Sequence, residues 1–187
     1  MRIYPLFVNQ YYGAIMERCQ ALSQISGQAQ DRIAAMNAAG VDPAAALLAA
    51  HRGQVFGQWR EFFTELRRLA DLNRTALVRR KSVDDLDVML SGVFSSAIAG
   101  SADGGNEDAA AAAAKGLKAV AGAASGRQGE QYGIGDQVAR VAELAAQLQG
   151  DAAACLSEHA GLAKDLQARY PDQDWGMLQA KQAAGAK

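Results

Sequence analysis

The sequence predicts an all-α protein: an elongated antiparallel helical bundle with coiled-coil-like packing. Half of the residues are hydrophobic, many of them alanine, and only three are proline. Alanine is the strongest helix former and proline the weakest, so this composition favours helices throughout. Apolar residues also recur at alternating steps of three and four, the heptad pattern that buries one face of a helix against another.

The first predicted helix covers residues 6–38. Ile15, Leu22 and Ile25 lie on its apolar stripe. Gly40 is the expected stop, because glycine readily adopts the left-handed conformation found at helix C-termini.

The second predicted helix covers residues 43–80 and carries the strongest heptad pattern. Asp42 is the expected N-cap, and Pro43 fits the first turn, where no N–H group is needed. A second apolar row, which begins at Phe56 and Phe63, widens the stripe and favours a bundle of three or four helices. The predicted interaction seam of this helix is Val55, Trp59, Phe62, Leu66, Leu69 and Asn73.

Two features of this helix leave alternatives open. At about 1.5 Å per residue it extends roughly 57 Å, so either the molecule is elongated or the helix bends at Gly53 or Gly57. Asn73 could fix the register of a buried seam, or it could stand at an exposed part of it.

The middle of the chain is less regular. Ser82 to Asp85 resemble a capping box, which predicts a third helix over residues 83–99. Residues 100–108 have a loop composition, and Ser125 to Gly135 form a second glycine-rich loop. Between them, residues 109–124 form an alanine-rich helix that we expect to be mobile or ordered only in an assembly.

The last predicted helix covers residues 136–170, and its seam is made of smaller residues than the seam of the second helix. It could therefore complement that helix, from the same chain or from a neighbouring copy. The chain thus divides into four segments. They are a helical hairpin plus third helix (1–99), a region of Gly/Ala-rich loops and a low-complexity helix (100–135), the long C-terminal helix (136–170) and a flexible tail (171–187). The seam of the last helix includes Val138, Val141, Leu148 and Leu162.

Cys155 and His159 are the strongest candidates for chemistry. They lie at i and i+4 on one helix face, with Asp151 one turn earlier, and could offer ligands to a metal. A closed zinc site needs four ligands, however, and Cys19 and His51 are isolated in the sequence. Because Cys155 and His159 fall on the predicted seam, packing is the favoured interpretation. We therefore predict no catalytic residue, no metal and no cofactor, and a protein that is not an enzyme.

Charge argues against a nucleic-acid partner. The net charge is −1, and no nucleic-acid-binding motif is present. Residues 43–81 are rich in basic side chains, whereas residues 82–108 carry acids and no base. These segments could pair within the molecule or between copies, or be solvated faces. The Gly133-Ile-Gly135 motif lacks the context of a phosphate loop.

Both ends of the chain carry aromatic residues. These could contact a hydrophobic surface or a partner, or they could cap the ends of the core. Trp175 is the example near the C-terminal end. The predicted hydrophobic-surface contacts near the N-terminus are Leu6, Phe7, Tyr11 and Tyr12.

No transmembrane segment is predicted, because no apolar run reaches the roughly 18–20 residues that a membrane span needs. No signal peptide is recognisable, and two cysteines make no disulfide framework. A cytoplasmic location is expected, and export by a route without a signal peptide stays open.

The run from Gln58 to Leu77, followed by Lys81 to Leu86, resembles the phasins, helical proteins that coat polyhydroxyalkanoate granules in bacteria. The alanine-rich second half and the Lys/Ala tail also fit this family. The resemblance implies self-association through coiled coils, attachment to a hydrophobic granule surface, and no catalytic residues.

The predicted function is that of a non-enzymatic, self-associating binding or coat protein, phasin-like on a hydrophobic granule. Its expected partners are further copies of itself, a helical protein or the granule surface. The alternative is a structural subunit or secreted component of a secretion apparatus, a filament or a phage particle.

Overall fold

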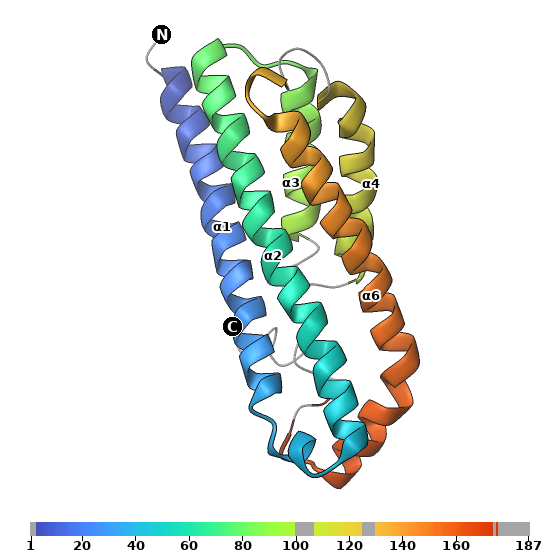
Figure 1. Ribbon diagram of the computed structural model, residues 1–187. Coiled ribbons are helices and arrows are strands. Elements are labelled where there is room, and N and C mark those ends of the chain that lie inside the picture. The colour runs from blue at the N-terminus through green and yellow to red at the C-terminus, as the bar shows by residue number, and fades with distance from the viewer. Residues whose placement is uncertain (1–2, 100–106, 125–129, 174, 176–187) are drawn as a thin grey trace.

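The computed structural model describes residues 3–99, 107–124, 130–173 and 175, which form an elongated bundle of antiparallel helices (Figure 1). The predicted all-α bundle is confirmed. The elements are α1 (Ile3–Ala34), the short 3₁₀ helix η1 (Asn37–Gly40), α2 (Pro43–Arg80), α3 (Asp85–Ala99), α4 (Glu107–Ala124) and α6 (Ile134–Arg169).

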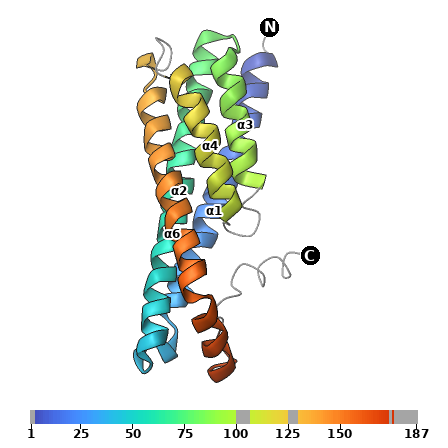
Figure 2. The same cartoon turned by 90° about the vertical axis from the view of Figure 1, so that its right-hand side faces the viewer.

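The bundle has two unequal halves along its length. The helices α1, α2 and α6 run from end to end, whereas α3 and α4 lie beside them over one half only, at the top of Figure 1 (Figures 1 and 2). We call this the five-helix half, and the remainder the three-helix half. The five-helix half contains the start of α1, the end of α2 and the start of α6.

The main hydrophobic core fills the five-helix half, with contributions from all five helices. Within it Trp59 stacks on Phe63, with ring centroids 5.4 Å apart, and Phe62 meets both rings edge-on. The three-helix half contains two small clusters instead. One holds Ala29, Ile33 and Phe56. The other holds Ala38, Ala45, Leu48, Leu166 and Trp175.

The predicted seam residues pack within a single chain. Trp59, Phe62, Leu66, Leu69 and Asn73 of α2 are buried, as are Val138, Val141 and Leu148 of α6. Val55 and Leu162 are partly buried. Because α2 packs directly on α6, the small-residue complement of α2 comes from the same molecule.

Helix α2 has the predicted bounds. The Asp42 carboxylate accepts hydrogen bonds from the backbone N–H groups of Ala44 (2.9 Å) and Ala45 (3.3 Å), so Asp42 caps the helix as expected. The helix continues through Gly57, where a Cβ atom would lie only 2.9 Å from the Gln30 amide nitrogen of α1. Helix α2 is therefore one continuous helix, and the molecule is elongated enough to hold its full length.

Two predicted helix boundaries are wrong. Helix α1 ends at Ala34, and η1 follows, because Ala38 turns inward to join the cluster around Trp175. Gly40 is therefore no left-handed stop. Helix α3 begins at Asp85, with Asp84 as N-cap: the Asp87 N–H bonds to the Asp84 carboxylate, and the Asp84 N–H bonds to the Asp87 carboxylate.

The expectations for α4 and the tail also need correction. Ala113, Leu117, Val120 and Ala124 of α4 are buried in the main core, so one face of this helix packs within the chain. Trp175 is buried against α2 and α6 rather than belonging to a flexible tail. Residues 176–187, and residues 100–106 and 125–129 of the two predicted loops, lie outside the described residues.

The two glycines of the Gly-Ile-Gly motif have structural roles. Gly133 has a φ of 68° and precedes α6. A Cβ atom on Gly135 would lie 2.9 Å from the Ala124 carbonyl oxygen, so the start of α6 can approach the end of α4 only with glycine there.

Candidate functional site

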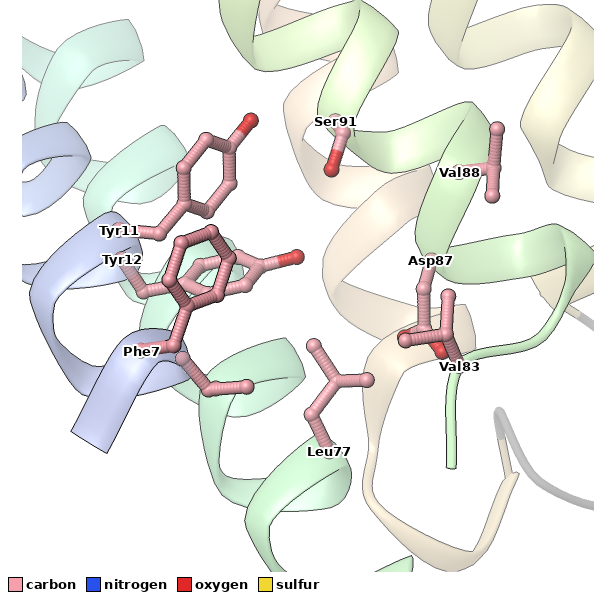
Figure 3. A pocket seen from close by; sticks show the side chains of 9 residues that line it. Phe7, Tyr11, Tyr12, Leu77, Val83, Asp87, Val88 and Ser91 are labelled. Atoms are coloured by element: carbon pink, nitrogen blue, oxygen red, sulfur yellow. The ribbon is translucent and has the colours of Figure 1, made fainter. Parts of the chain in front are cut away.

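An open groove of about 490 Å³ lies at the end of the five-helix half. The first turns of α1, the end of α2 and the start of α3 surround it. Figure 3 shows Phe7, Tyr11 and Tyr12 on one side of the groove and Val83 and Val88 on the other. The exposed part of its lining is almost entirely apolar. A volume of this size lies within the range of small-molecule pockets, roughly 300–1,000 Å³.

Large apolar side chains are unusually exposed around this groove. Within the described part of the chain, four of the seven exposed large hydrophobic residues line the groove: Phe7, which is 67% exposed, Tyr11, Val83 and Val88. A fifth, Leu6, is 60% exposed and precedes Phe7 on α1, outside the groove lining. The other two, Val41 and Leu47, lie at the opposite end of the bundle, around the start of α2. We define the apolar end patch as Leu6, Phe7, Tyr11, Val83 and Val88.

Tyr12 forms part of the groove floor and is buried, unlike the other three predicted contact residues. Its hydroxyl oxygen accepts a hydrogen bond of 2.8 Å from the Asn73 side-chain amide. Burial raises the pKa of Tyr12, although hydrogen bonds with Ser91 and Asn73 oppose this effect. The Tyr12 hydroxyl is therefore uncharged, and its hydrogen bond with Asn73 links α1 to α2. Asn73 thereby helps to fix the register between these two helices of one chain.

Asp87 is the one carboxylate among the residues lining the groove, and Arg80 neutralises it. It is buried and accepts two hydrogen bonds from the Arg80 guanidinium, at 2.8 and 2.9 Å. Arg80 also pairs with Asp84. Burial raises the pKa of Asp87, and the Arg80 charge opposes this effect. The basic and acidic segments therefore meet within the molecule here, where one arginine pairs with two carboxylates.

The cysteine residues do not form a nucleophilic site. Cys155 is buried, and burial raises the pKa of its thiol. Burial also raises the pKa of Cys19 to about 12. Since the thiolate is the reactive form, both thiols stay protonated at neutral pH. Asp151 is not directed at this pair but accepts a hydrogen bond from the Gln58 amide.

His51 is not isolated in space. Its Nδ1 atom lies 2.9 Å from Nε2 of His159, so the two histidines join α2 to α6 in the three-helix half. Sequence reasoning missed this pair because the residues are 108 positions apart. One feature of the sequence could have indicated the pair: both histidines lie at core-facing positions. His51 comes just before the seam of α2, and His159 lies on the seam of α6.

Comparisons with family models, with curated proteins and with solved structures found no match to this chain. None of the helices in the described ranges combines the length and the hydrophobicity needed to cross a membrane.

Proposed function

We propose that this protein is a non-enzymatic, self-associating coat or binding protein that attaches to a hydrophobic surface through the apolar end patch. The observation that carries the proposal is the concentration of exposed large apolar side chains around the groove. Exposed patches of this kind are typical of interaction sites rather than of ordinary protein surface.

The chemistry of the patch favours aliphatic chains as the ligand. Phe7 and Tyr11 project from α1, and Val83 and Val88 face outward near the start of α3. Because Arg80 already pairs with Asp87, the groove recognises apolar shape rather than charge. A lipid-coated hydrophobic particle, such as the granule that the phasin resemblance implies, presents aliphatic chains of this kind.

A particle-binding assay tests the proposal. The full chain is mixed with lipid-monolayer-coated hydrophobic particles, and the bound fraction is measured by flotation. We expect a Leu6→Ser/Phe7→Ser variant to bind at least about tenfold more weakly, because burying each side chain contributes on the order of 1–2 kcal/mol.

The opposite end of the bundle provides a matched control. Val41 and Leu47 are 79% and 60% exposed, and a Val41→Ser/Leu47→Ser variant removes similar apolar area there. This variant should bind like the wild type. Equal losses in the two double variants, or particle binding that neither variant weakens, would contradict attachment through the patch.

One observation favours the alternative of a subunit in a filament or larger assembly. The exposed large hydrophobic residues of the described ranges lie at the two ends of the elongated bundle. Contacts between unlike ends of successive copies generate open filaments. Light scattering with size-exclusion chromatography tests this: end-to-end assembly should weaken in both double variants, whereas surface attachment depends on the Leu6/Phe7 end alone.

A further inference from the structure

The geometry points to a binding site for a divalent transition-metal ion of the Zn²⁺ class, formed by His51, Glu158 and His159. The ligand atoms of these three residues all lie within 4.8 Å of one another. His51 comes from α2, and the other two residues come from α6. A metal ion there would link two helices in the half of the molecule with the smaller core.

The spacing of the two ring nitrogens is close to that of a metal site. Nδ1 of His51 and Nε2 of His159 are 2.9 Å apart. Two imidazole nitrogens bound to one tetrahedral zinc ion at about 2.0–2.1 Å are roughly 3.3–3.4 Å apart. Shared coordination therefore requires the two nitrogens to separate by about half an ångström, the proton between them to leave, and the rings to turn so that both lone pairs face the ion.

The position of the pair in the fold supports this assignment. His159 is only 8% exposed, and His51 faces it from the opposite seam. A polar pair inside a helix interface is destabilising unless its hydrogen-bonding groups are satisfied. One hydrogen bond satisfies one nitrogen of each ring, and metal coordination would satisfy the same nitrogens more strongly.

The chemistry of the donors selects the class of metal. Two imidazoles suit Zn²⁺, Ni²⁺ and Cu²⁺, and one carboxylate is compatible with zinc, whereas Mg²⁺ and Ca²⁺ favour all-oxygen sites. Glu158 is exposed and can approach from the solvent side. Three protein ligands leave a fourth position for water. Cys155 is not part of this group, which distinguishes the site from the Cys155–His159 pair considered, and not favoured, as a metal site in the sequence.

Nuclear magnetic resonance of the imidazole nitrogens tests the site directly. His51 and His159 are the only histidines in the sequence, so an untagged full-length chain gives no background. On titration with Zn²⁺, we expect the ring signals of both histidines to change together and to saturate at one equivalent. A change in one histidine alone, or no change at a fivefold excess of Zn²⁺, would overturn the proposal.

Variants then identify the ligands by calorimetric titration with Zn²⁺. His51→Gln and His159→Gln should each weaken binding by at least about tenfold, and Glu158→Gln should weaken it less. Cys155→Ser is the matched control, because it changes a buried residue one turn before His159 on the same helix, and it should leave binding unchanged. Loss of binding in Cys155→Ser alone would assign the metal to the thiol and reject the proposed site. The wild-type resonance experiment remains decisive if a histidine variant fails to fold.

Discussion

The two halves of the bundle share α1, α2 and α6, but different interactions hold them together. In the five-helix half, α3 and α4 complete one continuous core around Trp59, Phe62 and Phe63. The three-helix half has two small apolar clusters, with Met36 packed against both, and a polar contact between His51 of α2 and His159 of α6. The five-helix half therefore has one large apolar core, whereas the three-helix half combines small apolar clusters with a partly buried histidine pair.

The same comparison separates the candidate sites. The apolar end patch lies where the core is largest, so the scaffold beneath Phe7 and Tyr11 is rigid enough to keep large side chains exposed. The proposed metal site lies where the core is smallest. A bound ion would add a link between α2 and α6 beside the small cluster that contains Leu48 and Leu166.

Two phenylalanines test the difference in packing. Phe63 and Phe56 lie one heptad apart on α2, but Phe63 belongs to the main core and Phe56 to a small cluster. We expect Phe63→Ala to lower the free energy of unfolding by about 4–5 kcal/mol and Phe56→Ala by roughly 2–3 kcal/mol, because fewer contacts are lost in the smaller cluster. Urea denaturation measures both values.

Equal losses would show that the two halves are equally well packed. An alanine substitution at exposed Arg68, on the same helix, serves as a control and should change the free energy of unfolding by less than about 0.5 kcal/mol.

Acid should weaken the three-helix half through Asp42. This residue caps α2, and its carboxylate also pairs with Arg169 near the end of α6 at 2.5 Å. Desolvation raises its pKa, but hydrogen bonds from Ala45 and Ala44 and the charge of Arg169 outweigh that effect, so the pKa lies below its ordinary value. A lowered folded-state pKa stabilises the protein above the unfolded-state pKa, about 3.9, and the stabilisation is lost as the pH falls through the folded-state pKa.

Asp42→Asn isolates this effect, because asparagine also caps helices but cannot titrate. The wild type should be more stable than Asp42→Asn at pH 7, and the difference should shrink below about pH 4. Asp42→Ala should lose more than Asp42→Asn at pH 7, since it also lacks the cap. Urea denaturation across this pH range measures the differences, and a wild-type advantage that is as large at pH 3 as at pH 7 would refute the role of the charge.

The sequence predicts those parts of the fold whose signals are local. The bounds of α2 could be predicted because Asp42 and Pro43 mark its start with their own side chains. The buried seam followed from a heptad pattern that continues over several turns. The exposure of Leu6 and Phe7 at one end was also an expected alternative, and the structure places both at the surface.

The parts that were missed depend on contacts between distant residues. An alanine-rich helix looks as if it has little to pack, yet α4 approaches α3 so closely that a Cβ atom on Gly116 would lie 3.0 Å from a Val93 methyl group. Small residues permit that approach, but hydrophobicity along the sequence does not report it. The pairing of His51 with His159 likewise requires the register between α2 and α6, which no local pattern gives.

The smallest expected effect concerns the other end of α2, at Lys81. This residue has a φ of 59°, and its N–H group bonds to the Leu77 carbonyl oxygen at 2.9 Å, so it ends the helix in the left-handed conformation. A side chain is strained there, and Lys81→Gly should therefore stabilise the protein by about 0.5–1 kcal/mol, measured by urea denaturation.

Lys81→Ala is the matched control, because it removes the charge but keeps the Cβ atom, and it should give no gain. A similar gain in both variants would assign the effect to charge rather than to backbone strain.

Hydrogen exchange of Lys81→Gly compares the two halves. Since Lys81 lies in the five-helix half, Lys81→Gly should slow hydrogen exchange of the amides that open only on global unfolding. Amides in the three-helix half that exchange through local opening should keep their rates, because that opening leaves the end of α2 intact.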